Sequence, residues 1–243
     1  MGYLSRNDLE RIATRIFNDY KHLPGLMSQQ VDYVDPEILA CGLFGFHIDY
    51  FHLSKDGLTL RMTAFKEVAV EIYNDSKQPC LYYLDVKTLL IETDLKNNPT
   101  LYGRYHFTIA HETAHQILAG LYPTDRVTQN RVIHYRGHSP QHPIRDWSEW
   151  QADNLASALL LPIEIVYGAL HRFDLEHGID ILSKVYRPKE YGQFCEMAEF
   201  LGVSKQAMSI RLKRLSLLKK DYLQNPYVLV DVEKEDDEGW LNL

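Results

Sequence analysis

The chain has 243 residues, of which 45% are hydrophobic and 24% are charged, and its formal net charge is -7. This length permits one catalytic domain with a small helical appendage, and the composition excludes a disordered chain, a collagen-like repeat and a disulfide scaffold. The net negative charge argues against a protein that coats nucleic acid, because such binding depends on neutralising phosphates.

The N-terminal sequence and the cysteines bear on where the protein works. The first ten residues, MGYLSRNDLE, lack the basic and then apolar segments of a secretory signal. The longest largely apolar run, 155–161, is too short to cross a bilayer. Cys41, Cys80 and Cys195 are widely spaced and form no CxxC pair, so neither a disulfide framework nor a cysteine zinc site is expected. We therefore expect a cytoplasmic protein with no membrane association.

The chain is expected to begin with helices. Residues 5–22 place Leu9 and Ile16 on one face of a helix, and Pro24-Gly25 ends it. A second, short helix is expected to start near Asp35-Pro36, because proline is tolerated in a first helical turn.

Strands are expected next. Alternation of apolar and polar residues over 44–53, 58–65 and 67–73 indicates strands. Residues 81–90 are apolar and fit either a strand or a helix. A small antiparallel sheet is therefore predicted over about 44–90.

Two helices follow the sheet and contain most of the chemically informative residues. The first is predicted over about 104–119 and stops at Gly120. The second is predicted over about 149–160, with its start near Ser148 and its end before Pro162, where a third helix can begin.

The first of these helices contains the string His111-Glu112-Thr113-Ala114-His115. Positions four apart lie one turn above each other, so the imidazoles of His111 and His115 can face one metal ion. A catalytic zinc site takes a third protein ligand and leaves one position for water. Glu112 can reach a water at that position and accept its proton, which assigns it as the catalytic base.

The third ligand is less obvious. The candidates within reach in sequence are Asp146, Glu149, Asp153, His134, His138 and His142. Glu149 and Asp153 are four apart on a helix whose same side is otherwise apolar, and two inward carboxylates require a reason. A metal supplies it if Glu149 binds one Zn²⁺ per chain and Asp153 accepts the outer N–H of a ligand histidine, His111 being favoured.

The other histidines and the oxyanion partner are less well defined. His106 lies five residues before His111 and is expected to be structural or on the surface. The histidines of the polar loop are expected to face solvent. The possible oxyanion partners, among which the sequence gives no basis to choose, are Tyr122, His134, Tyr135, His138 and Tyr167.

These motifs resemble those of a known family, the ImmA/IrrE metallopeptidases. The segments that carry the resemblance are Phe107–His115, Glu149–Ala156 and Leu159–Pro162. The resemblance spans about 30–170 and implies a gluzincin-like fold with zinc on the residues that match His111, His115 and Glu149. It also implies that the protein cuts a partner transcriptional repressor.

The C-terminal segment resembles a helix-turn-helix. Gly202 stands at the turn, and Ser204 starts a basic second helix. Residues 190–220 are expected either to pack as a helical hairpin or to bind DNA or a repressor.

The expected fold class is α+β, with the small sheet packed on the active-site helices in a zincin-like manner. The predicted divisions are a zinc metallopeptidase domain at 1–185, the helix-turn-helix-like segment at 190–220 and an acidic tail at 221–243.

Three functions compete. The leading one is a zinc-dependent endopeptidase that makes limited, site-specific cuts in a partner protein, a DNA-binding repressor. The rival is a non-enzymatic transcriptional regulator that keeps the metallopeptidase fold as a scaffold and binds DNA or a repressor. A zinc hydrolase acting on a non-peptide bond is the third.

Overall fold

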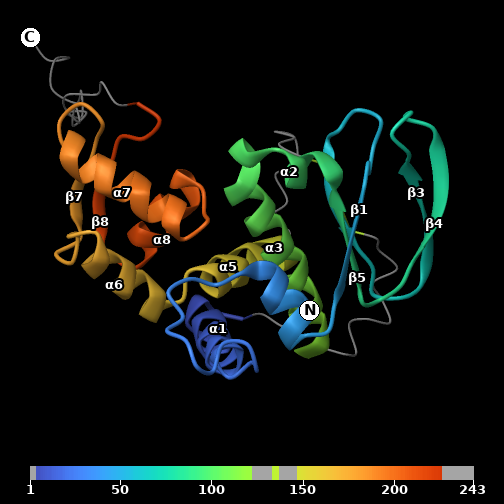
Figure 1. The fold of residues 1–243 in the computed structure, drawn as a ribbon, viewed down its shortest axis with the longest axis horizontal. Helices are drawn as coiled ribbons and strands as arrows, with labels where there is room; N and C mark the ends of the chain where they lie inside the picture. Colours follow the sequence, from blue (N-terminus) through green and yellow to red (C-terminus); the bar gives the residue numbers. More distant parts are fainter. Residues whose placement is uncertain (1–3, 122–132, 137–146, 226–243) are drawn as a thin grey trace, which may run out of the picture.

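The computed structural model describes residues 4–121, 133–136 and 147–225. The helices are α1 (Arg6–Lys21), a π-helical segment (Ile38–Leu43), α2 (Thr93–Asn97), a 3-10 turn (Pro99–Leu101), α3 (Tyr102–Leu121), α5 (Trp147–Leu160), α6 (Ile163–Arg172), α7 (Pro188–Phe200) and α8 (Lys205–Arg214). The strands are β1 (His47–Phe51), β2 (Thr59–Thr63), β3 (Val68–Tyr73), β4 (Pro79–Leu84), β5 (Thr88–Glu92), β6 (Ile133–Arg136), β7 (Ile179–Leu182) and β8 (Leu218–Asp221). The fold is α+β, with the strands β1 to β5 at one end, α1, α3 and α5 in the middle, and α6 to β8 at the other end (Figure 1).

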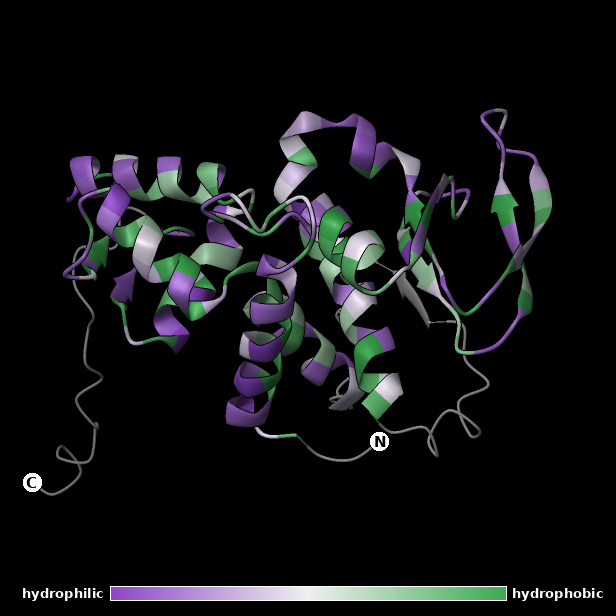
Figure 2. Cartoon of the chain, turned by 60° about the horizontal axis from the view of Figure 1, so that its bottom comes forward, coloured by the Kyte–Doolittle hydropathy of each residue, from purple (hydrophilic) through white to green (hydrophobic). Residues whose placement is uncertain are grey.

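Helix α1 starts as the sequence predicts. The Ser5 hydroxyl accepts a hydrogen bond from the backbone N–H of Asp8, and the Asp8 carboxylate accepts one from the N–H of Ser5, which is a capping box. The buried face carries Leu9, Ala13 and Phe17. This face packs against α5, while the outer side of α1 is mostly hydrophilic (Figure 2).

The larger sheet is mixed, and the prediction of an antiparallel sheet is wrong for one pair. Its strand order is β1-β5-β2-β6, with β5 parallel to β1 and antiparallel to β2. All five residues of β5 are buried, and strands buried on both faces belong inside a sheet. The long connection at 52–87 allows the parallel pairing, because parallel strands need a crossover of a dozen residues or more.

Residues 67–73 also depart from the single predicted sheet. They form β3, which pairs with β4 in a separate two-stranded sheet. A single bridge between His52 and Tyr73 links this hairpin to the chain after β1. The ambiguous segment 81–90 holds the end of β4 and most of β5, so both of its apolar parts are strands.

Helices α3 and α5 pack on each other through small side chains. Ala110 and Ala114 of α3, and Ala152 and Ala156 of α5, have no exposed surface. Small residues at such an interface let two helix axes come close. Helix α3 continues one residue past its predicted stop at Gly120, and both helices otherwise match their predicted bounds within two residues.

The C-terminal end contains a pair of helices and an unpredicted pair of strands. Helices α7 and α8 are joined by a turn in which Gly202 has a φ of 65°, and the Ser204 hydroxyl caps α8 by accepting from the N–H of Ala207. Strands β7 and β8 pair in parallel. The predicted boundary near residue 185 therefore falls between two paired strands.

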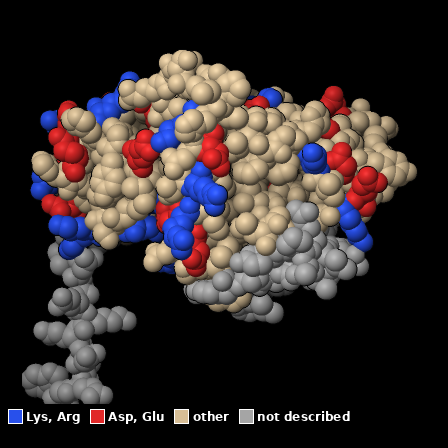
Figure 3. Space-filling model, turned by 90° about the horizontal axis from the view of Figure 1, so that it is seen from below, with Lys and Arg blue, Asp and Glu red and all other residues tan. Residues whose placement is uncertain are grey.

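Acidic side chains compensate part of the basic character of residues 204–220. Arg211 is buried, and its guanidinium pairs with Glu10 of α1. Two lysines also have acidic partners, since Lys213 Nζ lies 2.8 Å from Asp221 and Lys219 Nζ lies 2.7 Å from Asp180. Basic and acidic side chains alternate on the face shown in Figure 3. This part of the chain is therefore less cationic than its sequence suggests.

In the described ranges, no single helix combines the length and the apolar character that a membrane span requires. The bent pair α5 and α6 meets these criteria only when both helices are counted together.

Candidate metal centre

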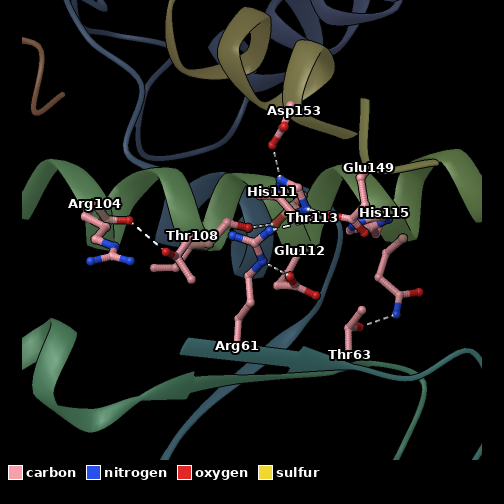
Figure 4. A network of polar contacts seen from close by, with 12 residues as sticks. Arg61, Thr63, Arg104, Thr108, His111, Glu112, Thr113, His115, Glu149 and Asp153 are labelled. Carbon is pink, nitrogen blue, oxygen red and sulfur yellow. Dashed lines mark hydrogen bonds and ion pairs between the residues drawn. The ribbon is translucent and has the colours of Figure 1, made fainter. Parts of the chain in front are cut away.

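Helix α3 brings the two histidines of the motif together. His111 and His115 are one turn apart and have no exposed surface. Their Nε2 atoms lie 2.8 Å from each other (Figure 4). The helical spacing that the sequence predicted thus turns both imidazoles toward one point.

Helix α5 adds Glu149 to this pair. Its Oε1 lies 3.0 Å from Nε2 of His115, and its Oε2 lies 3.3 Å from Nε2 of His111. For zinc ligands at about 2.0 to 2.1 Å in a tetrahedron, the expected ligand-to-ligand separation is about 3.3 Å. The three donors are therefore as close as one small ion requires, and this buried cluster could hold a metal ion.

Asp153 lies on the outer side of the cluster. Its Oδ1 is 2.8 Å from Nδ1 of His111, and Figure 4 shows it pointing from α5 toward that ring. A neutral imidazole that donates from Nδ1 has a bare lone pair at Nε2. Without a cation, that lone pair would face the Glu149 carboxylate. The donor set therefore suits a metal better than it suits a network of hydrogen bonds alone.

The two glutamates have opposite electrostatic environments. Burial raises the pKa of Glu112 above its ordinary value, and the nearby charge of Arg61 opposes this shift without cancelling it. For Glu149 burial also acts to raise the pKa, but in the metal-free chain protonated imidazoles at His111 and His115 outweigh it through hydrogen bonds and charge, and hold the pKa below its ordinary range. An ionised ligand and a carboxyl group that can take up a proton are thus placed side by side.

Arg61 is a site residue that the sequence reasoning missed. It lies in β2, and its Nε is 2.6 Å from Oε1 of Glu112 while its Nη2 is 3.8 Å from Oε2 of Glu149. The alternation in 58–65 makes Thr59, Arg61 and Thr63 one polar face, which reads as a solvent face. In the structure α3 covers that face, since all five residues of β2 are buried. An arginine at the centre of a short strand, between Leu60 and Met62, was the available signal.

The remaining predicted residues divide into two groups. His106, which was expected to be structural or on the surface, is buried, and its ring contacts that of Tyr102. Tyr167 is exposed on α6. The candidates whose side chains lie outside the described part of the structure are Tyr122, His134, Tyr135, His138, His142 and Asp146.

A second group of possible ligands, His52, Glu92 and Asp94, lies at the end of β5. Glu92 already accepts a hydrogen bond from the N–H of Leu53 at 2.8 Å, and its other oxygen is 2.8 Å from Nδ1 of His52. These contacts satisfy the buried carboxylate without an ion.

Comparison of the chain with known protein families and with curated proteins finds no match.

Proposed function

We propose that this chain is a cytoplasmic, zinc-dependent endopeptidase that makes limited, site-specific cuts in a partner protein. The observation that carries the proposal is the convergence of His111, His115 and Glu149, with the Glu112 carboxylate buried beside them. A structural zinc site has four protein ligands, whereas a catalytic site has three and leaves one position open. Among the residues that the structure describes, three donors and an adjacent carboxylate converge, which favours the catalytic type.

Each residue has a distinct task in the proposed reaction. Bound zinc supplies a Lewis acid that polarises a peptide carbonyl and promotes ionisation of water. Glu112 takes the proton from the attacking water and delivers it to the departing amine nitrogen. Asp153 holds His111 in the tautomer that presents Nε2 to the ion.

The proposed substrate is a DNA-binding transcriptional repressor. This part rests on the resemblance of the two motif segments to ImmA/IrrE metallopeptidases, which also suggests a zincin-like arrangement of the sheet and active-site helices. The helix-turn-helix-like segment at α7 and α8 is the proposed contact for that partner. DNA itself is less favoured, because three basic side chains in residues 204–220, those of Arg211, Lys213 and Lys219, are paired with acids.

The test is incubation of the zinc-loaded chain with the repressor encoded beside its gene, followed by mass spectrometry of the products. We expect one or a few defined fragments, which a chelator abolishes and added Zn²⁺ restores. The matched control is Glu112→Gln. Cleavage at the wild-type rate in this variant, or an intact repressor after incubation with the wild-type chain, would contradict the proposal.

A further inference from the structure

The metal centre contains two buried or partly buried carboxylates. In the proposed reaction one of them binds the metal and the other must stay off it. Glu112 has no exposed surface, and the side chain of Glu149 is 32% exposed. A divalent cation among these residues attracts both groups. If Glu112 became a ligand it would occupy the position that a catalytic site leaves open, and it would no longer be available as a base.

Arg61 contacts the two carboxylates differently, which distinguishes Glu112 from Glu149. Its Nε is 2.6 Å from Oε1 of Glu112, whereas its Nη2 is 3.8 Å from Glu149, beyond hydrogen-bonding distance. At this separation in a buried site, the guanidinium and an ionised carboxylate attract each other strongly. Nε of Arg61 and Oε1 of Glu112 form this ion pair without the geometry of a hydrogen bond, and Oε2 of Glu112 has no hydrogen-bond partner in the described part of the structure. Arg61 therefore holds one oxygen of Glu112 and leaves the other without such a contact.

The strand that carries Arg61 is fixed against α3. Nε2 of Gln116, one residue after the second histidine, donates to Oγ1 of Thr63 at 2.6 Å and to the carbonyl of Ala64 at 3.0 Å. Arg61 is two residues before Thr63 on the same face of β2. The contacts of Gln116 therefore also fix the position of the Arg61 guanidinium relative to α3. Figure 4 shows Arg61 rising from β2 toward Glu112.

We propose that Arg61 is a positioning residue that holds Glu112 away from the bound metal and so keeps it as a base. The assignment of Glu112 as the base rests on the proposed function. The separation of Glu112 from the ion is a property of the metal centre alone, and it is measurable without any protein substrate.

The test is a double-mutant cycle on metal affinity. Zinc dissociation constants are measured by competition with a chromophoric chelator for the wild type, Arg61→Met, Glu112→Gln and the double variant. We expect Arg61→Met to bind zinc about tenfold more tightly, within the range for groups in direct contact, because Glu112 is released toward the ion. Glu112→Gln and the double variant are expected to bind with wild-type affinity, since neither has a free carboxylate.

Cobalt provides a second readout. The visible absorption of the Co²⁺-loaded chain reports the number and type of ligands, and we expect it to change in Arg61→Met and to remain wild-type in Arg61→Lys, which retains the charge. Wild-type affinity and spectrum in Arg61→Met would overturn the proposal. So would tighter binding that persists in the double variant, because Glu112 would then not be the added ligand.

Two arrangements keep the outcomes separable. Arg61→Gln replaces Arg61→Met and is judged by the same criteria if the methionine variant does not fold. When the repressor assay works, Arg61→Met is expected to lower kcat with little change in KM, and Arg61→Lys to recover it. If the chain cleaves nothing but the zinc affinities of the four proteins follow the predicted double-mutant cycle, the proposed function is refuted and the role of Arg61 stands.

Discussion

Side chains of the same type have different environments at the candidate metal centre because their neighbours differ. Glu149 touches two imidazoles, which favours its charged form. Glu112 is fully buried next to Arg61, and burial favours its protonated form. His111 has an acidic partner at Nδ1, in Asp153. These differences lead to two predictions at the scale of single residues.

Replacing the proposed base separates metal binding from catalysis. We expect Glu112→Gln to retain zinc and to cut the partner protein about 10²- to 10⁴-fold more slowly, because a general base is lost while all three ligands remain. His115→Ala should lose both zinc and cleavage. Metal content is measured by atomic absorption, and product formation is measured on the same preparation of each variant. Together they separate loss of metal from loss of catalysis. Strong zinc loss in Glu112→Gln would contradict the assigned roles.

Removing the partner of His111 affects the metal without removing a ligand. Asp153→Ala is expected to weaken zinc binding by about 10- to 100-fold, because the ring loses the group that fixes its tautomer and orientation. Chelator competition measures this change. A zinc affinity equal to that of the wild type would place Asp153 outside the metal centre.

At the scale of elements, the position of the α7–α8 turn depends on a glycine in α3. A Cβ atom added at Gly103 would lie 2.4 Å from the backbone N of Ser204 and 2.7 Å from the carbonyl carbon of Val203. Both atoms belong to backbone and cannot rotate away. The beginning of α3 is therefore in direct contact with the turn that precedes α8.

This contact predicts opposite effects for two glycine-to-alanine substitutions in helices. Gly103→Ala is expected to lower the free energy of unfolding by about 1 to 3 kcal/mol, because overpacking outweighs the gain in helix propensity. Gly168→Ala in α6, where nothing lies within 4 Å of the added atom, is expected to raise it by about 0.5 to 1 kcal/mol. Urea denaturation compares the two. Equal changes in the free energy of unfolding for the two variants would show that the turn between α7 and α8 moves to accommodate the added methyl group at no cost.

At the scale of the whole molecule, one buried arginine joins three helices. Arg211 of α8 donates from Nε to the carbonyl of Leu161, in the link between α5 and α6, at 2.8 Å. Its terminal nitrogens contact both carboxylate oxygens of Glu10 in α1. The C-terminal helices are thereby attached to the first helix and to the end of the helix that supplies Glu149.

Loss of this arginine should destabilise the entire chain. We expect Arg211→Ala to lower the free energy of unfolding by about 3 kcal/mol, the low end for breaking a buried ion pair, because Glu10 is partly exposed. Arg214→Ala, at an exposed position three residues later, serves as control and should change it by less than about 0.5 kcal/mol. A calorimetric transition that is unaltered in Arg211→Ala would disprove this role.

Local patterns sufficed to predict the elements that hold the candidate ligands. The four-residue spacing of His111 and His115, and that of Glu149 and Asp153, depends only on helical periodicity, and both helices form close to their predicted bounds. Ser5 and Ser204 cap their helices through contacts within three residues. Such features are determined by neighbours in sequence, which is why the sequence alone reveals them.

The remaining features depend on which segments meet in space. The parallel pairing of β1 with β5, the pairing of β7 with β8 and the burial of Arg211 all join residues more than 30 positions apart. Arg61 is 51 positions before Glu112, and its polar strand face was indistinguishable from a solvent face until α3 covered it. Tertiary packing decided these points, because periodicity describes how residues alternate along one element and carries no information about what covers each face.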